Sequence, residues 1–326
     1  MTWRVLALPP LPEEALRDLL GPLGERVEVS VPAGRDRPAL LAALPEAEIV
    51  VGDWSGELAL DAEAVLAAPR LAFVQQPSVG VDGHDLAALA AAGVPLANTA
   101  GVSAIAVAEW CLAAALTLSR RLLAADAAVR AGDWPQLDLG PRELYGSRVG
   151  IIGFGPIGEA CARMFGAHGC EVSYWTRRPR RTPYTYREPA ELMATSDVLI
   201  AVIALSEETR GLIDPSRMPA GSLLVNAARG GVVDRAGLLS ALGSGHLGGA
   251  ALDVFETEPL PPDDPLRDDP RVLLSPHVAG VTPQSTGRLV RRVLDNLEAA
   301  VDGRPVTGVL NEVDPVVRRR SGGGRT

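Results

Sequence analysis

The clearest indication of the fold class comes from the stretch at residues 149–158, which reads Val149-Gly150-Ile151-Ile152-Gly153-Phe154-Gly155-Pro156-Ile157-Gly158. Its apolar half predicts a buried strand at residues 148–152, and a helical pattern over residues 156–168 begins within the glycines. A further apolar run at residues 171–175 predicts the next strand. A glycine-rich turn between a strand and a helix, with a second strand to follow, is the context that a dinucleotide-binding turn requires.

The three glycines of this turn each have a separate physical reason. Gly153 permits the tight turn, Gly155 lets a pyrophosphate approach the backbone, and Gly158 lets the helix pack on the sheet. The N-terminus of the helix favours an anion, because its amides and its dipole point toward it. The predicted dinucleotide site consists of Gly153, Gly155, Pro156, Ile157 and Gly158.

The end of the strand at residues 171–175 distinguishes between two cofactors. A site for NAD usually has an aspartate or glutamate there, which accepts a hydrogen bond from the ribose 2′-hydroxyl. This chain has Thr176, Arg177 and Arg178 instead, and a hydroxyl with guanidinium groups suits a 2′-phosphate. The sequence therefore favours NADP over NAD, with a merely solvated arginine loop as the alternative interpretation.

Apolar runs and helical patterns alternate on both sides of the glycine turn, which predicts an α/β protein with helices on both faces of a parallel sheet. At 326 residues the chain is long enough for about two domains. The further expected strands lie at residues 3–8, 27–31, 48–51, 71–75, 198–203, 223–226, 250–254 and 272–274. The further expected helices lie at residues 13–20, 102–129 and 286–302.

Composition excludes several classes of function. The net charge of −9 argues against a nucleic-acid surface or a basic membrane anchor. All 31 basic residues are arginines, which excludes a phosphate-loop lysine, a Schiff-base lysine and a lysine general base. The three cysteines form no CxxC pair, and with four histidines they offer few metal ligands. The longest apolar stretch contains Glu109 and no signal peptide is evident, so we expect a cytoplasmic protein without a metal site.

Three charged residues downstream stand just beyond the ends of expected strands. They are Arg229, Glu258 and His277. Residues that follow the carboxyl ends of parallel strands converge on one ligand crevice. We therefore expect these three side chains to lie close together although they are far apart in the sequence.

The chain resembles the D-isomer-specific 2-hydroxyacid dehydrogenases up to about Leu310. The resemblance rests on the segments around the three charged residues and on four further segments in the family's order, at residues 79–82, 98–101, 106–109 and 206–213. The run Trp175-Thr176-Arg177-Arg178 is similar to the glyoxylate/hydroxypyruvate reductase branch of that family.

The resemblance implies a domain organisation. A Rossmann nucleotide domain, residues 100–283, would be inserted into a flavodoxin-like substrate domain formed by residues 1–99 and 284–312. Both domains would be doubly wound around parallel sheets. We expect residues 313–326 to form a disordered basic tail. Members of the family are usually homodimers joined through their nucleotide domains.

The resemblance also implies the chemistry. His277 would protonate the carbonyl oxygen of a 2-oxo acid as hydride reaches the carbonyl carbon, and Glu258 would orient and stabilise its ring. Arg229 would hold the substrate carboxylate. The product would be a D-2-hydroxy acid, formed from a small substrate such as glyoxylate or hydroxypyruvate. The cofactor would be NADP, or NAD as the less favoured choice.

Further residues are expected around the cofactor and the substrate. Ala227 and Asp253 would contact the cofactor, with a turn-capping role as the alternative for Asp253. Backbone amides after the strand at residues 71–75 would bind the substrate carboxylate. Trp54 would line the pocket or be purely structural. The expected substrate-binding residues are Ser78, Val79, Gly80, Arg229 and Trp54. The remaining histidines, His84, His168 and His246, are expected to be structural or solvated.

Departures from the family pattern leave the substrate open. Val102-Ser103-Ala104 stands where many members have an asparagine, and Ala204 stands where a proline is common. Two alternative functions are a nucleotide-sensing binding protein, like the corepressors that share this fold, and a dehydrogenase of another small anion such as phosphite or formate. In each case the expected partner is a small molecule rather than a nucleic acid or a membrane.

Overall fold

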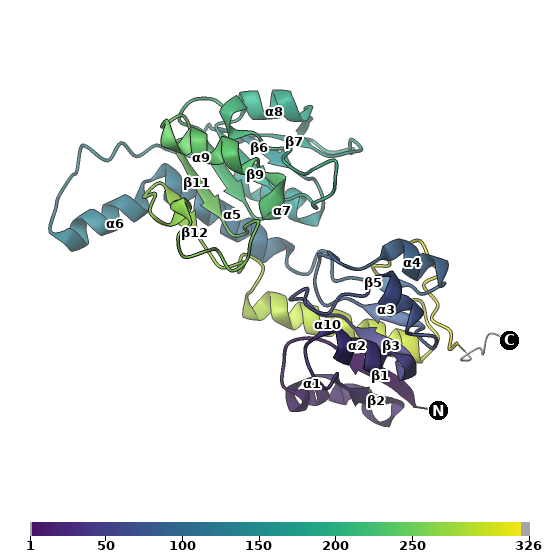
Figure 1. Cartoon of the computed structure of the whole chain (residues 1–326). Helices are drawn as coiled ribbons and strands as arrows, with labels where there is room; N and C mark the ends of the chain where they lie inside the picture. The colour runs from purple at the N-terminus through teal and green to yellow at the C-terminus, as the bar shows by residue number, and fades with distance from the viewer. Residues whose placement is uncertain (1, 321–326) are drawn as a thin grey trace. The chain divides into compact units, whose positions relative to one another are not determined.

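The computed structural model describes residues 2–320 and divides the chain into two compact units. Unit 1 contains the residues up to Val102 together with those from Pro283 onward, and unit 2 contains Ser103–Thr282. Unit 2 is therefore inserted into the sequence of unit 1, as the colours of Figure 1 show. Each unit is built on one parallel sheet, so the predicted class with two doubly wound α/β domains is confirmed.

The sheet of unit 1 has five parallel strands in the order β2-β1-β3-β4-β5. Val5 of β1 pairs with Val29 on one side and with Ile49 on the other. This is the strand order of the flavodoxin-like doubly wound fold. The strands are β1 (Trp3–Ala7), β2 (Val27–Ser30), β3 (Ile49–Val51), β4 (Phe73–Gln75) and β5 (Leu96–Ala97).

Short helices connect these strands, and aspartates begin three of them. Asp36, Asp61 and Asp85 each accept a hydrogen bond from the backbone amide three residues further on, which satisfies a donor in the first turn. The α-helices are α1 (Glu13–Leu20), α2 (Arg37–Ala43), α3 (Ala62–Leu66), α4 (Leu86–Ala91) and α10 (Pro283–Val301), and the 3-10 helices are η1 (Gly21–Arg26) and η2 (Leu44–Glu46).

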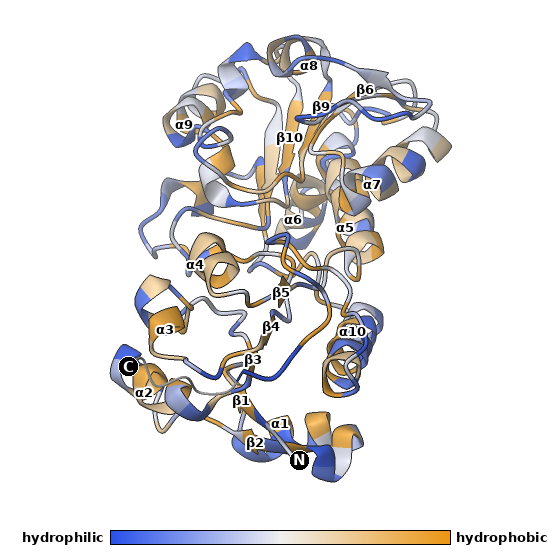
Figure 2. Cartoon of the chain, turned by 90° about the vertical axis from the view of Figure 1, so that its right-hand side faces the viewer, coloured by the Kyte–Doolittle hydropathy of each residue, from blue (hydrophilic) through white to orange (hydrophobic). Residues whose placement is uncertain are grey.

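Neighbouring residues of a strand bury their side chains on opposite faces of this sheet. Val5 packs in a cluster with Val293 and Leu297 of α10, whereas Leu6 packs in a second cluster with Leu40 of α2. Helices therefore cover both faces, which explains why the central strand β3 is apolar and buried throughout. In Figure 2, α10 alternates between hydrophobic and hydrophilic residues, as a helix with one buried face does.

The segment beyond α10 packs on unit 1. Pro305 pairs with Val316 in an antiparallel bridge, Val317 is buried, and the guanidinium of Arg319 lies 4.4 Å from the centroid of the Trp3 ring. The prediction of a disordered tail is therefore wrong for residues 313–320, because apolar side chains of this segment are buried and its arginines have partners. Residues 321–326 of the predicted tail lie outside the described residues.

The sheet of unit 2 has seven parallel strands in the order β12-β11-β10-β9-β6-β7-β8. Ile151 of β6 pairs with Tyr174 of β7 and with Ile200 of β9, so the strand order reverses at β6, as in a Rossmann fold. Figure 2 shows the central strands β9 and β10 as hydrophobic. The strands are β6 (Arg148–Ile152), β7 (Glu171–Trp175), β8 (Thr185–Tyr186), β9 (Val198–Ala201), β10 (Leu223–Asn226), β11 (Gly249–Leu252) and β12 (Val272–Leu274).

The single helix predicted at residues 102–129 is two helices in the structure. Arg121 adopts a left-handed conformation with φ 55°, which ends one helix and starts the next. Its guanidinium donates to the carbonyl oxygen of Gly248 at 3.3 Å. Apolar residues resume at Leu122, directly after the polar residues 119–121, so the sequence predicted one helix across the break. The helices of unit 2 are α5 (Ala104–Ser119), α6 (Leu122–Ala131), α7 (Pro156–Ala167), α8 (Pro189–Thr195), α9 (Arg235–Gly243), η3 (Pro215–Arg217), η4 (Gly230–Val232) and η5 (Pro265–Arg267).

Candidate active site

The glycine turn between β6 and α7 has close backbone contacts at two of its glycines. Gly153 has a φ of 101°, and a Cβ there would lie 2.5 Å from the carbonyl oxygen of Val202. A Cβ on Gly158 would overlap the carbonyl oxygen of Gly153, so α7 begins in direct contact with the turn. A larger residue at either position would displace the backbone.

The remaining glycine of the turn faces open space. A Cβ on Gly155 would meet no atom within 4 Å, and Pro156 begins α7 immediately after it. An anion can therefore approach the N-terminus of α7, where the first amides lack helical partners. Ile157 packs against the core behind the turn, and Ala227 directly follows β10, which is separated from β6 by β9. The turn as a whole fits the pyrophosphate of a dinucleotide.

The loop after β7 carries the residues predicted to select the cofactor. Thr176 is half-buried, whereas Arg177 and Arg178 are exposed and form no hydrogen bond or ion pair within residues 2–320. Arg180 differs, because its guanidinium donates to Glu159 of α7 at 3.0 Å and its backbone exchanges two hydrogen bonds with a tyrosine hydroxyl. Arg180 thus fixes the conformation of the loop, whereas the guanidinium groups of Arg177 and Arg178 are available to an anionic ligand.

His277 and Glu258 form a hydrogen-bonded pair. Nδ1 of His277 lies 2.8 Å from Oε2 of Glu258, and Oε1 accepts from the backbone amide of Phe255 at 2.9 Å. A carboxylate can only accept, so the proton between the two side chains belongs to Nδ1. Nε2 is then the nitrogen that can exchange a proton with a ligand. The histidine side chain is 48% exposed and the glutamate side chain 36%, so a ligand can reach the ring.

Asp253 stabilises the segment on both sides of His277 by hydrogen bonds. Its buried carboxylate accepts from the hydroxyl of Ser275 and from the amides of Val278 and Ala279, at 2.5, 2.8 and 2.9 Å. His277 has a φ of 56°, a left-handed conformation that needs such support in a residue with a side chain. These contacts favour the turn-capping interpretation of Asp253, and its contact with a nicotinamide stays a prediction.

Arg229 follows β10 in a loop that touches the loop of Glu258. A Cβ on Gly230 would overlap the backbone at Phe255, so the missing side chain lets the two loops approach. The side chain of Asn226 orders the turn, with Oδ1 accepting from the amide of Ala228 at 3.0 Å and Nδ2 donating to the carbonyl oxygen of Arg229 at 3.1 Å. The guanidinium of Arg229 is half-buried and also donates to the carbonyl oxygen of Ala228.

Three neighbouring strands of unit 2 therefore lead into the three predicted catalytic residues. Arg229 follows β10, Glu258 follows β11 and His277 follows β12, and these strands are adjacent and parallel in the sheet. Their carboxyl ends lie along the same edge, which is where ligands of open α/β sheets bind.

The predicted carboxylate-binding residues of unit 1 follow β4. The carbonyl oxygens of Ser78 and Val79 accept from the amide of Thr99 and the side chain of Asn98, at 3.1 and 2.7 Å, and that of Gly80 accepts from the hydroxyl of Ser78 at 2.7 Å. In the part of the chain that the structure describes, the amides of residues 78–80 donate to no protein acceptor. The loop therefore offers a row of backbone donors, as an anion-binding nest does.

Trp54 lies in unit 1 just beyond β3. Its exposed ring borders an apolar hollow together with Val51, Pro77 and Val293. Pro77 immediately precedes the loop of Ser78, so the ring is near the proposed carboxylate-binding residues without contributing a polar group to them. A direct contact of Trp54 with substrate stays a prediction.

The cysteines have a structural character. Cys111, Cys161 and Cys170 are buried free thiols. A hydrogen bond with Cys161, aided by burial, raises the pKa of the Cys111 thiol, and burial raises that of Cys170. Protonated, buried thiols are poor nucleophiles. Across residues 2–320, no three His, Cys, Asp or Glu side chains gather as metal ligands would, and no helix has the length and apolarity needed to cross a membrane.

Sequence reasoning missed a group of buried polar residues behind the loop of unit 1. Gln76 and Asp53 are each 3% exposed, and His84 is half-buried beside them. One available signal was the pair Gln75-Gln76 at the end of an apolar strand, since buried polar side chains need hydrogen-bond partners.

Comparisons with known proteins bear on both units. Residues 112–279 match the family model described as D-isomer specific 2-hydroxyacid dehydrogenase, NAD binding domain. A D-3-phosphoglycerate dehydrogenase of Mycobacterium tuberculosis is 34% identical over 314 residues, covering 92% of this chain and 59% of the relative. A glyoxylate reductase of Aeropyrum pernix is 36% identical over 276 residues, covering 80% of this chain and 82% of the relative.

A solved structure gives a similar result. An NADPH-dependent glyoxylate/hydroxypyruvate reductase from Sinorhizobium meliloti, in complex with NADP and malonate, matches with a TM-score of 0.82 at 28% identity. The match covers 98% of this chain and 99% of that chain.

The glycine turn, the hydrogen-bonded pair of His277 and Glu258 and these matches point to the same family. The chain belongs to the D-isomer-specific 2-hydroxyacid dehydrogenases. It spans about three fifths of the length of the mycobacterial relatives that it matches, 59% for the protein of M. tuberculosis. The family model names NAD and the S. meliloti neighbour holds NADP, so the family alone does not decide the cofactor.

Proposed function

We propose that this chain reduces a small 2-oxo acid, such as glyoxylate or hydroxypyruvate, to the D-2-hydroxy acid, with NADPH preferred over NADH. The observation that carries the proposal is the pairing of His277 with Glu258 at 2.8 Å, in loops that adjoin the loop of Arg229. An acid–base pair beside a guanidinium suits a substrate with a carbonyl to protonate and a carboxylate to hold.

The proton transfer follows from the tautomer of His277. When bound, the reduced nicotinamide supplies the hydride that forms the new C–H bond at the carbonyl carbon. His277 gives the proton on Nε2 to the carbonyl oxygen, so the C=O group becomes C–OH. The ring is left neutral with its other proton on Nδ1, still bonded to Glu258. The exposed ring then regains a proton from solvent, and the glutamate carboxylate stabilises the charge.

Each unit by itself offers a candidate group for the substrate carboxylate. In unit 2, the planar guanidinium of Arg229 can donate two parallel hydrogen bonds to a carboxylate. In unit 1, the amides of Ser78, Val79 and Gly80 are neutral donors that carry partial positive charge. Analogues that lack the carboxylate should therefore be poor substrates.

The decisive experiment follows NADPH consumption by absorbance with glyoxylate, hydroxypyruvate, pyruvate, phenylpyruvate and 3-phosphohydroxypyruvate. We expect the highest kcat/KM with glyoxylate or hydroxypyruvate. A preference for 3-phosphohydroxypyruvate would reassign the substrate to that of the mycobacterial relatives. No turnover with any 2-oxo acid, by a protein that binds NADPH, would overturn the proposed reaction.

The preference for NADPH rests on the loop after β7. Among the described residues, neither Thr176 nor Arg177 forms a hydrogen bond or ion pair with a carboxylate, so the guanidinium is available to a 2′-phosphate. Arg177→Ala should weaken NADPH binding by about ten- to a hundredfold and leave NADH nearly unchanged. Thr176→Asp should disfavour NADPH and favour NADH. Arg181→Ala, in the same loop, is the matched control, and equal affinity of the wild type for both cofactors would refute the preference.

A homodimer joined through unit 2 is also proposed. Leu122 and Val129 of α6 and Trp134 and Leu137 after it expose large apolar side chains, Trp134 to 79%. Figure 1 shows α6 and the following segment extending from the body of unit 2. Light scattering should report a dimer, and Trp134→Ser with Leu137→Ser should shift it toward monomer; a monomeric wild type would refute the proposal.

A reducing, cytoplasmic location is proposed as well. The three unpaired thiols support it, because disulfides form mainly in oxidising compartments.

A further inference from the structure

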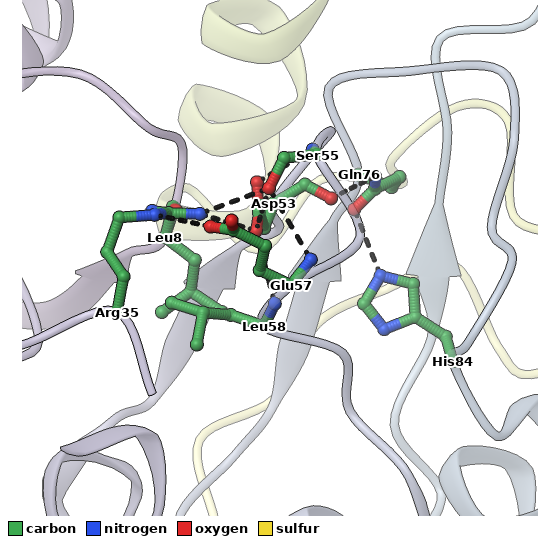
Figure 3. Close-up of polar contacts among 8 residues, drawn as sticks. All are labelled: Leu8, Arg35, Asp53, Ser55, Glu57, Leu58, Gln76 and His84. Carbon is green, nitrogen blue, oxygen red and sulfur yellow. Dashed lines mark hydrogen bonds and ion pairs between the residues drawn. The ribbon is translucent and has the colours of Figure 1, made fainter. Parts of the chain in front are cut away.

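The side-chain amide of Gln76 lies at the centre of a hydrogen-bonded group in unit 1. Gln76 follows β4 and is buried. Its Nε2 donates to the backbone carbonyl of Asp53 at 3.0 Å and to the hydroxyl of Ser78 at 2.9 Å. Its Oε1 lies 3.0 Å from Nε2 of His84 (Figure 3). One amide therefore connects the loop after β3, the loop after β4 and the segment before α4.

The contacts of His84 fix which ring nitrogen carries the proton. The backbone amide of Leu60 donates to Nδ1 at 3.0 Å, so Nδ1 must be unprotonated. Nε2 then carries the proton and donates it to Oε1 of Gln76. Because this N–H needs an acceptor, the glutamine must direct its carbonyl oxygen toward His84. Its NH₂ group then points to Asp53 and Ser78. His84 is thus neutral in this arrangement.

The orientation of Gln76 is transmitted to the loop that offers backbone donors. The hydroxyl of Ser78 accepts from Gln76 and donates to the carbonyl oxygen of Gly80 at 2.7 Å. This bond, together with that from Asn98 to the carbonyl oxygen of Val79, engages the loop carbonyls with the protein and leaves the amides available to an anion. Without the bond from Gln76, the hydroxyl of Ser78 would be free to rotate.

Two further features hold Gln76 in place. A Cβ on Gly52 would overlap its Oε1, so the glutamine amide occupies the space that a side chain at this position would need. The carboxylate of Asp53 accepts from Arg35 at 2.6 Å, from the amide of Ser55 at 2.8 Å and from that of Leu58 at 3.1 Å (Figure 3). The carbonyl that receives the glutamine NH₂ group therefore belongs to a fixed turn.

We propose that His84 and Gln76 are positioning residues for substrate: neutral His84 orients the amide of Gln76, which holds the loop Ser78-Val79-Gly80 in its carboxylate-binding conformation. This inference rests on the proposed function, because that function assigns the carboxylate to this loop. Neither side chain is proposed to touch the substrate. Their effect should therefore fall on the binding of the carboxylate and leave the transfer of hydride and proton largely intact.

Two substitutions of His84 separate this role from a merely structural one. In His84→Asn, Oδ1 replaces Nδ1 and can still accept from Leu60, but the donor to Gln76 is lost. In His84→Gln, Nε2 replaces the ring Nε2 and can still donate to Gln76, but the acceptor for Leu60 is lost. We expect His84→Asn to raise KM for glyoxylate about three- to tenfold with kcat nearly unchanged, because one hydrogen bond is removed. His84→Gln should stay close to the wild type.

The reverse order would overturn the proposal. If His84→Gln is the more damaged variant, the ring acts through Leu60 and supports the fold only. If kcat falls, KM rises and the thermal midpoint drops in both variants, His84 has a general structural role. His168→Asn is the matched control, because His168 is an exposed histidine of unit 2 at the end of α7.

A measurement without turnover keeps this test separate from that of the proposed function. Amide chemical shifts of Val79 and Gly80 are recorded by NMR in the wild type and in both variants, before and after addition of oxalate. Positioning by His84 predicts that these shifts change in the ligand-free His84→Asn variant and not in His84→Gln. Unchanged shifts in His84→Asn would refute positioning. Shifts that respond to His84→Asn but not to oxalate would instead refute carboxylate binding by the loop.

Discussion

His277 and His84 are held in opposite ways by the two units. In unit 2, Nδ1 of His277 donates to the carboxylate of Glu258, and nearly half of the side chain is exposed. In unit 1, Nδ1 of His84 accepts from the amide of Leu60, and Nε2 donates to the amide oxygen of Gln76. A carboxylate neighbour stabilises a charged ring, whereas a donor on one side and an amide oxygen on the other suit the neutral ring.

The contrast shows that the partner of Nδ1 decides what a histidine can do. His277 can gain and lose the proton on Nε2 while its bond to Glu258 persists. His84 would lose its bond to Leu60 if Nδ1 became protonated. Burial lowers the pKa of His84 below its ordinary value of 6.5, and this outweighs the nearby charges of Asp53 and Asp82, which act to raise it. One ring is thus suited to transfer protons and the other to hold a fixed conformation.

The largest expected effect tests the proton-transfer half of this comparison. His277→Ala should lower kcat for reduction by about 10²–10⁴-fold, because the acid that protonates the carbonyl oxygen is lost. Cofactor affinity, measured by fluorescence titration, should stay near that of the wild type. His84→Asn provides the contrast, since it should leave kcat nearly unchanged. A His277→Ala enzyme with wild-type turnover would show that another group supplies the proton.

Replacing Glu258 by an amide makes the surroundings of His277 resemble those of His84. Glu258→Gln replaces the carboxylate by an amide, which cannot accept from Nδ1 and from the amide of Phe255 as fully as two carboxylate oxygens do. A charge-assisted bond is worth about 1.5–3 kcal/mol, so kcat should fall by roughly ten- to a hundredfold. The pH range of activity for reduction should also narrow on the alkaline side. Glu256→Gln, two residues away, is the control, and an unaltered pH profile in Glu258→Gln would contradict the role given to the carboxylate.

Sequence and structure agree where one local pattern determines the outcome. The strand at residues 148–152 and the glycines after it specify a turn through a contact that lies within the turn itself, because a Cβ on Gly158 would overlap the carbonyl oxygen of Gly153. The segments of Arg229, Glu258 and His277 could be found because each stands beyond an apolar strand and matches a family motif. Parallel pairing then brings their ends to one edge of the sheet.

Features that depend on distant partners could not be predicted. The helix break at Arg121 is an example, because the carbonyl oxygen that its guanidinium contacts belongs to the distant residue Gly248. Residues 313–320 look like a basic tail until the surface that buries Val317 is known. The contact of His84 with Gln76 depends on the conformation of two loops. The sequence around His84 alone therefore suggested a structural or solvated histidine.

A smaller effect is expected from a substitution that disturbs the His84 network without removing a titratable group. Gly52→Ala places a Cβ where Oε1 of Gln76 lies, so the glutamine amide must move. We expect KM for glyoxylate to rise about three- to tenfold, as in His84→Asn, with a stability loss of about 1–3 kcal/mol from overpacking. Gly21→Ala, where a Cβ meets no atom within 4 Å, is the control. A Gly52→Ala enzyme with unchanged KM would show that the position of the amide does not matter for binding.

The smallest expected effect concerns stability as a function of pH. Because the pKa of folded His84 is lowered by burial, the unfolded chain binds a proton below pH 6.5 that the folded chain does not yet bind. Stability contributed by neutral His84 is therefore complete above pH 6.5 and is lost as the pH falls toward the folded pKa, with a slope of at most about 1.4 kcal/mol per pH unit for one proton. Urea unfolding of the wild type and of His84→Gln at several pH values isolates this contribution, because the other titrating groups are common to both. The stability difference between them should shrink or reverse as the pH falls. A difference that is independent of pH would mean that His84 titrates alike in the folded and unfolded chains, and the contrast with His277 would then rest on their contacts alone.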